Sequence, residues 1–349
     1  MIYEQFKKGI NIGSWLSQYD IIAEKPLTED SLRQHFDSFI KEDDIRQIAS
    51  WQFDHIRLPI SGYLIYDVEG NHMNSDTLEY LYKCIKWCSD CHLNIVLDLH
   101  DIYGNVYGAM DSAMPLLTDA DLQERFIRVW ELLAQELLNV QGTVIMFELL
   151  NEVSDASGSY PFSDIAGEHY DFSHKESLLW NKLYKRCIER IRRIDPDRLI
   201  LVGSNGQNSV VYLKELEILD DPAVFYNFHY YDPQVFTHQQ ADFSEEMREF
   251  DQAVGYPDDI SGFVAYLDAH LMERLLQHAI DFIKETGKEL YCGEFGVIAH
   301  APAQASMKWA SDLTEILGEN HIGYALWNYK YLDFGLLDMN GKPCSSLFG

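Results

Sequence analysis

The sequence predicts an α/β fold, specifically a (β/α)8 barrel with a small subdomain inserted after the sixth strand. Eight short apolar segments alternate with amphipathic helical segments along the 349 residues, a pattern typical of parallel strands joined by helical crossovers. A doubly wound open sheet is the alternative, but no Gly-x-Gly-x-x-Gly follows the first strand segment and no phosphate-binding loop occurs. Hydrophobic residues make up 47% of the chain, and no repeat or linker divides it, so we expect residues 1–349 to form a single domain.

Short apolar runs mark the strands, because the parallel strands of a barrel are buried on both faces. In chain order they are expected at residues 8–13, 53–58, 93–99, 144–150, 199–202, 224–228, 289–292 and 323–327. Helices are expected where apolar residues recur at helical spacing, and the first of them opens with acidic residues that suit a helix N-terminus. These helices are residues 43–51, 78–91, 122–138, 178–194, about 210–216, 271–285 and 305–317.

Two stretches depart from this alternation. Residues 232–269, between the sixth strand and its helix, are too many for an ordinary loop and are rich in aromatic and acidic side chains. We interpret them as a subdomain over the barrel mouth, in which Phe236, Phe243, Phe250 and Tyr256 mostly form a small core. Only about twenty residues follow the last strand, so the eighth helix is expected to be absent or rudimentary, and residues 346–349 resemble a truncation.

Charge and cysteine usage limit the partners. Lys and Arg total 27 against 56 Asp and Glu, a formal net charge of −29, which disfavours nucleic acid and anionic membranes and suits a neutral substrate. No apolar stretch is long enough to span a bilayer and no signal peptide is visible, so a cytoplasmic protein is expected, with a secreted mature form as the alternative. Cys84, Cys88 and Cys91 share one helix face; buried structural thiols are favoured there over a metal site completed by His92.

Polar residues gather at the carboxyl ends of the predicted strands, where the active site of a barrel is built. The fourth strand ends in Asn151-Glu152 and the seventh delivers Glu294, so two carboxylates at two strand ends suggest acid/base and nucleophilic work on one substrate. The other strand-end residues are Arg57, His100, His229, Tyr231 and Trp327. Each alone could be a packing residue, but packing does not explain eight of them at the correct ends of six strands.

These residues resemble the signature of glycoside hydrolase family 5, a family of retaining barrel enzymes, over essentially the whole chain. Within that family the sequence is most similar to the clostridial endoglucanase C type. The motifs that carry this likeness are Gly9-Ile10-Asn11-Ile12-Gly13-Ser14-Trp15, Phe147-Glu148-Leu149-Leu150-Asn151-Glu152, Asn227-Phe228-His229, Phe236-Thr237-His238-Gln239 and Tyr291-Cys292-Gly293-Glu294-Phe295-Gly296-Val297. Val153 departs from the family, many members of which have Pro there, without chemical consequence.

The resemblance implies a role for each residue. Glu152 is the expected acid/base and Glu294 the nucleophile. Arg57 and Tyr231 should hold Glu294 ionised, and His229 should orient Glu152. Asn151 is expected at the sugar 2-hydroxyl, His100 near the 3-hydroxyl, and Trp327 beneath the sugar under attack, followed by a cis peptide bond. Asn11 is also expected to bind substrate, whereas Glu148, deeper in the strand, is interpreted as a structural carboxylate.

The resemblance implies an endo-acting β-glucanase on β-1,4 or mixed-linkage β-1,3-1,4 glucans, without cofactor or metal. Within the family an exo-acting β-glucosidase, a β-1,3-glucanase or a β-mannanase is the alternative. Two other classes of function compete with this one. A barrel that only binds glycans would have lost one carboxylate, and both are present. A metal-dependent hydrolase could use His100 and His229 with a carboxylate, and it predicts inhibition by chelators.

Overall fold

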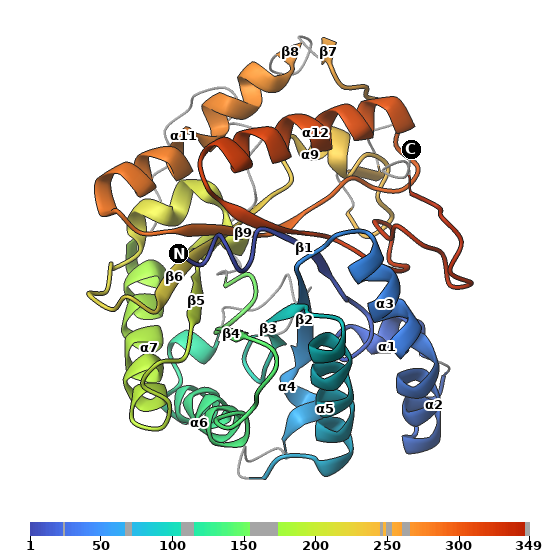
Figure 1. Ribbon diagram of the computed structural model, residues 1–349. Coiled ribbons are helices and arrows are strands. Elements are labelled where there is room, and N and C mark those ends of the chain that lie inside the picture. The colour runs from blue at the N-terminus through green and yellow to red at the C-terminus, as the bar shows by residue number, and fades with distance from the viewer. Residues whose placement is uncertain are drawn as a thin grey trace.

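The chain forms a closed barrel of eight parallel strands surrounded by helices, as the sequence predicts (Figure 1). This computed structural model describes all residues except 24, 67–71, 106–114, 154–173, 245–246, 249–252, 260–265 and 346–349. Each strand pairs in parallel with its neighbours in the order β1-β10-β9-β6-β5-β4-β3-β2, and β1 closes the ring against β2. Across the described residues, no helix combines the length and the apolar character needed to cross a membrane.

The eight predicted strands are all present, with bounds shifted by a few residues. They are β1 Lys8–Asn11, β2 His55–Ser61, β3 Asn94–Asp101, β4 Ile145–Glu148, β5 Ile200–Gly203, β6 Val224–Tyr230, β9 Leu290–Phe295 and β10 Gly323–Leu326. The seven predicted helical segments correspond to α3 Glu42–Ser50, α5 Ser75–Asp90, α6 Ala120–Glu136, α7 His174–Arg192, the 3-10 helix η3 Val210–Glu215, α11 Ala269–Thr286 and α12 Ala303–Glu319.

Among the described residues, six short helical segments were not predicted: α1 Tyr19–Ile22, α2 Glu29–Phe39, α4 Gly62–Ile65, the 3-10 helix η1 Pro115–Leu117, α8 Asn205–Asn208 and α9 Gln234–Thr237. The longest of them, α2, begins at a capping box in which Thr28 and Ser31 each accept from the other's backbone N–H. It buries only three side chains, so its apolar pattern is weak and the capping residues were the available signal.

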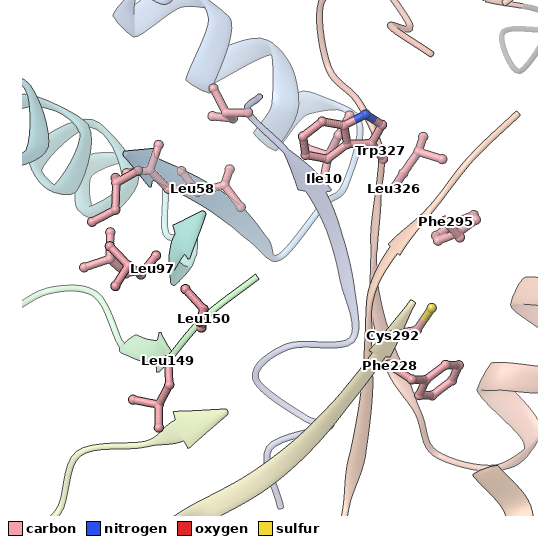
Figure 2. Close-up of a cluster of buried hydrophobic side chains, with 14 of the residues drawn as sticks. Ile10, Leu58, Leu97, Leu149, Leu150, Phe228, Cys292, Phe295, Leu326 and Trp327 are labelled. Carbon is pink, nitrogen blue, oxygen red and sulfur yellow. The ribbon is translucent and has the colours of Figure 1, made fainter. Parts of the chain in front are cut away.

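Alternation along the strands separates two apolar cores. The larger lies between strands and helices, where Trp130 of α6 packs on Phe147 of β4 with ring centroids 4.9 Å apart. Figure 2 shows part of it, with side chains such as Leu58, Leu97 and Phe228 contributed by different strands. The smaller lies inside the barrel and consists of Ile2, Phe6, Val96, Met146, Leu201, Phe225, Tyr291 and Ala325.

Toward the carboxyl ends, the inward positions change from apolar to polar. Along β3 the inward residues run from Val96 through Asp98 to His100, and along β6 from Phe225 through Asn227 to His229. Because side chains alternate across a strand, each of these series occupies one face. The apolar plug therefore closes the lower barrel, and the polar residues above it form the floor of the site.

The insertion after β6 has few regular elements among its described residues: α9, and the two-residue strands β7 Asp258–Asp259 and β8 Tyr266–Leu267, which pair antiparallel. Phe236 and Tyr256 are buried, as predicted, whereas Phe243 exposes 52% of its surface. Phe250 lies outside the described residues.

The C-terminal segment and the cysteines also bear on the sequence predictions. After β10 the described residues form no helix; the segment folds back through bridges of Leu337 with Lys330 and Pro343. Residues 346–349 lie outside the described part. Cys84 and Cys88 are buried free thiols, as predicted, but Cys91 is only partly buried.

Candidate active site

Glu152 and Glu294 meet above the polar end of the barrel. Glu152 follows β4, and Glu294 lies on β9, beside a register shift between Phe228 and His229 of β6. Ligand-type atoms of Glu152, His229 and Glu294 all lie within 4.8 Å of one another. Carboxyl groups about 5–5.5 Å apart are the arrangement of retaining glycosidases, whereas inverting enzymes separate them further.

Glu294 is held from two sides, as the resemblance implies. Arg57 Nη1 donates to its Oε1 at 2.6 Å, and the Tyr231 hydroxyl donates to its Oε2 at 3.0 Å. These two donors favour the ionised form and fix the direction of the carboxylate. Glu294 is nearly buried, with 6% of its side chain exposed.

Glu152 lies beside the ring of His229. His229 Nδ1 and Glu152 Oε1 are 2.9 Å apart, and Glu152 keeps 14% of its side chain exposed. The backbone of Glu152 is left-handed, with φ of 41°, which is costly for a residue with a side chain and tends to persist at functional sites. The turn aims this carboxyl across the barrel mouth toward Glu294.

Three buried carboxylates, Asp98, Glu148 and Glu294, contact Arg57. Among the described residues, no other Arg or Lys side chain contacts them. The Arg57 guanidinium makes a two-point contact with Glu148, at 2.7 and 2.9 Å, and approaches Asp98 Oδ2 at 3.1 Å in addition to Glu294. Glu148 also accepts from Asn227 Nδ2 at 2.8 Å. Glu148 is thus the structural partner that the sequence suggested, since it lies fully buried beneath the mouth.

Asn11 and Arg57, both predicted to line the site, lie buried at the end of the barrel. Asn11 has no exposed surface; its Oδ1 accepts from Arg57 and its amide donates to the Gly293 carbonyl. Arg57 is equally buried. The polar atoms of both side chains are therefore engaged in contacts within the barrel.

Asn151, His100 and Trp327 lie at or just beyond the carboxyl ends of β4, β3 and β10, respectively. Asn151 Oδ1 accepts from Arg57 Nη2 at 2.8 Å, which turns its NH2 group away from Arg57. His100 Nδ1 lies 2.7 Å from Asp98 Oδ2, and its ring is parallel to that of Trp327, with centroids 5.7 Å apart. The Trp327–Asn328 peptide bond is cis, as expected from the resemblance.

The shape of this corner depends on Gly13. A Cβ at Gly13 would lie 2.9 Å from the Trp327 ring, so only glycine leaves room for the indole. The same residue's N–H donates to Asn328 Oδ1 at 2.9 Å, which joins the first strand to the last across the barrel closure.

Burial and the neighbouring charges together separate the protonation states of the two glutamates. Burial, reinforced by the negative charge of Glu294, raises the pKa of Glu152 well above its ordinary value. Burial also raises the pKa of Glu294, but the charge of Arg57 opposes that rise. When the pair carries one proton, Glu152 therefore holds it and Glu294 is the ionised member.

Two neighbours also have displaced pKa values. Burial raises the pKa of Asp98 to about 7, against the opposing charge of Arg57. Burial lowers the pKa of His100 to about 4, so this ring is neutral near neutral pH.

Glu152, His229 and Glu294 are the one group of described residues placed closely enough to hold a metal ion. His100 is not part of that group, so the two-histidine site considered from the sequence is not assembled. The three side chains already have partners, because His229 contacts Glu152 while Arg57 and Tyr231 donate to Glu294.

Sequence reasoning gave no role to three polar residues that contact the site: Asp98, Asn208 and Asn227. Asp98 and Asn227 stand within apolar strand segments, where an isolated polar residue is itself a signal of a buried partner. Asn208 gave no such signal, because it lies in the turn after β5.

Comparison with known proteins places the chain among glycoside-cleaving barrels. The model of the cellulase family, glycosyl hydrolase family 5, matches residues 23–333. Endoglucanase C of Acetivibrio thermocellus is 36% identical over 97% of this chain and 96% of its own length. Cellodextrinase A of Ruminococcus flavefaciens is 33% identical over 90% of this chain and 83% of its own. The crystal structure of endoglucanase Cel5A from Thermotoga maritima superposes with a TM-score of 0.76 at 22% identity, covering 99% of this chain and 97% of that one.

Proposed function

Because the chain belongs to the cellulase family, glycosyl hydrolase family 5, and is a glycoside hydrolase, we propose that it cleaves internal bonds of β-glucans with retention. The observation that carries this proposal is that a carboxylate oxygen of Glu152 lies within 4.8 Å of one of Glu294, a spacing that leaves no room for a water molecule between nucleophile and sugar. The favoured substrates are β-1,4 and mixed-linkage β-1,3-1,4 glucans.

The mechanism follows from the protonation states. In the first step Glu294 attacks the anomeric carbon while Glu152 gives its proton to the departing oxygen, and the glycosidic bond breaks. In the second step water attacks the glycosyl-enzyme, Glu152 takes up the water's proton, and Glu294 departs as a carboxylate. Arg57 and Tyr231 orient the nucleophile in both steps.

Three side chains are proposed to hold the sugar under attack. The NH2 group of Asn151 suits the 2-hydroxyl, where hydrogen bonding strengthens in the transition state. His100 is proposed near the 3-hydroxyl. Trp327 offers a flat apolar face to the pyranose ring, and its parallel stacking with His100 supports a continuous floor.

The substrate proposal rests on the relatives' names. Endoglucanase C and cellodextrinase A together point to β-1,4-glucan chains and their oligosaccharides. An exo-acting β-glucosidase, a β-1,3-glucanase or a β-mannanase is the alternative. Product analysis on barley β-glucan, carboxymethyl cellulose, laminarin and glucomannan separates these activities. Predominant early release of long oligosaccharides from barley β-glucan supports endo-cleavage, and monosaccharide release alone contradicts it.

Azide rescue tests the roles of the two carboxylates. With an activated aryl cellobioside, Glu152→Ala should still form the glycosyl-enzyme and should be accelerated by azide to a β-glycosyl azide. Glu294→Ala should give the α-azide or no rescue, because it lacks the nucleophile. Glu148→Gln is the matched control, because Glu148 is a third carboxyl group from the same strand and a partner of Arg57. This substitution should lower the melting temperature, and azide should not restore any activity that it removes. A β-azide from both alanine variants would reject the assignment.

A further inference from the structure

Asn208 contacts His229, the histidine that lies beside Glu152. Asn208 Nδ2 lies 3.1 Å from His229 Nε2, while His229 Nδ1 lies 2.9 Å from Glu152 Oε1. The three side chains therefore form a chain from the turn after β5 to the acid/base. Asn208 is fully buried and His229 is 2% exposed.

His229 is neutral in this series of three side chains, so one of its ring nitrogens carries a hydrogen and the other does not. Burial, together with the positive charge of Arg57, lowers the pKa of His229 well below its ordinary value. The acidic groups that face the ring are Glu152 and Glu294, the latter 3.7 Å from Nδ1.

The orientation of the Asn208 amide selects the tautomer. Its NH2 group faces Nε2 and can only donate, so Nε2 accepts and the hydrogen of His229 lies on Nδ1. In the present orientation one buried acceptor, Asn208 Oδ1, lacks a partner among the described residues. If the amide were turned over, two N–H donors would lie unpaired at that place, which costs more. Gly203 makes room for that oxygen, because a Cβ there would lie 2.3 Å from it.

The backbone holds Asn208 in place through an unusual turn. Gly206, Gln207 and Asn208 are all left-handed, with φ of 60°, 59° and 58°, a conformation that asparagine tolerates better than most residues. Gln207 N donates to the carbonyl of Val153 at 3.2 Å, which ties the turn to the residue that follows Glu152. Ser209 forms a bridge with His229 on the other side. The turn is thus attached to both partners of the chain.

We propose that Asn208 is a positioning residue that fixes the Nδ1–H tautomer of His229 and thereby directs the proton of Glu152 to Oε2. Because Nδ1–H donates to Oε1, the carboxyl proton is left on the other oxygen, free for the departing glycosidic oxygen. In the opposite tautomer, bare Nδ1 would accept that proton from Oε1 and turn it away from the substrate. The inference rests on the proposed function, in which Glu152 is the acid.

Nuclear magnetic resonance of protein labelled with 15N-histidine tests the tautomer directly. Long-range 1H–15N spectra, assigned with a His229→Gln variant, should show hydrogen on Nδ1 and a bare Nε2 in the unmodified protein. In Asn208→Asp, where a carboxylate replaces the amide, Nε2 should become protonated. A proton on Nε2 of the unmodified protein would overturn the proposal.

Kinetics with aryl cellobiosides of graded leaving-group ability test the consequence. In Asn208→Asp, kcat/KM should fall about tenfold or more on phenyl cellobioside, whose leaving group needs a proton. On 2,4-dinitrophenyl cellobioside, whose leaving group departs without protonation, it should fall less than about threefold. The matched control is Gln207→Asn, at an exposed position of the same turn, which should keep both values within about twofold. Activity on the dinitrophenyl substrate also reports that each variant is folded.

Glu152→Ala in the same series separates the two ideas. Suppose that the loss of kcat/KM in Glu152→Ala depends on the leaving group, whereas Asn208→Asp loses the same factor in kcat/KM on every substrate. The inference about Asn208 is then wrong and the proposed function stands. If Glu152→Ala shows no leaving-group dependence, the proposed function fails and the inference fails with it.

Discussion

At the scale of single residues, the site contains more carboxyl groups than cationic side chains to balance them. Arg57 contacts Asp98, Glu148 and Glu294, and Glu152 lies close to the last of these. Removing that arginine would leave buried charges without a partner, which is far more costly than losing a surface ion pair. The excess negative charge is what keeps a proton on Glu152, so the arrangement that lowers stability also prepares the acid.

The proton on Glu152 makes stability depend on pH. Because burial raises the pKa of Glu152 in the folded protein, the folded state binds more protons than the unfolded state above the ordinary carboxyl range. Stability should therefore fall as pH rises through the folded-state pKa. Glu152→Gln removes this titration, so its melting temperature should exceed that of the unmodified protein by a margin that grows from about pH 5 to about pH 8.

Thermal unfolding followed by circular dichroism across this range measures the margin. Glu315→Gln, at an exposed position of α12, is the control and should show no such trend. A margin for Glu152→Gln that is constant or shrinks with pH would mean that Glu152 is not the group holding the proton.

At the scale of elements, the strands supply the chemistry and the insertion after β6 supplies aromatic surface. Phe236 of α9 is fully buried, but Phe243 is half exposed, and its ring lies 5.9 Å from that of His238. His238 in turn contacts Tyr231, the residue that donates to Glu294. We propose that the insertion borders the cleft and that Phe243 stacks on a sugar away from the bond being cleaved.

Alanine substitution of two phenylalanines in the insertion should therefore have different effects, one on polymer cleavage and the other on stability. Phe243→Ala should lower kcat/KM on barley β-glucan by about threefold to tenfold, the loss of one stacking contact, and should leave a small aryl glycoside nearly unaffected. Phe236→Ala should destabilise the protein by about 3–5 kcal/mol, because it empties a packed site. Urea unfolding and paired kinetics measure both effects; an equal loss on both substrates for Phe243→Ala would exclude sugar stacking.

At the scale of the whole molecule, the net charge of −29 is the dominant long-range property. Like charges repel within the folded protein and also repel an anionic substrate, and dissolved salt screens both effects. A neutral glucan is not subject to the second effect. The charge thus predicts which substrates respond to salt.

Raising sodium chloride from about 20 mM to about 200 mM shortens the screening length severalfold, so it should raise the melting temperature. Over the same range kcat/KM on anionic carboxymethyl cellulose should rise about twofold or more, whereas on neutral barley β-glucan it should stay nearly constant. Matched salt series on the two polymers check this. The same response with both would show that the net charge does not control substrate approach.

The local pattern of the chain determined the strand order, most helices and the two carboxylates. Apolar runs that end in polar residues, such as the one before Asn151 and Glu152, carry this information because strands alternate their faces and a barrel collects its strand ends. The buried role of Glu148 was also accessible from its depth in the strand. Substrate binding by Asn11 stays a prediction, since nothing local distinguishes a residue facing the sugar from one lying beneath it, and its side chain is buried.

Only the tertiary structure decided which partner each polar group has. Arg57 joins β2 to carboxylates on β3, β4 and β9, and Asn208 reaches His229 from the turn after β5. These contacts depend on the register of neighbouring strands and on three consecutive left-handed residues, neither of which has a periodic signature in sequence. Local hydrophobic pattern decides which face of a strand is buried, but pairing between distant segments decides which side chains meet, and the protonation of Glu152 depends on that pairing.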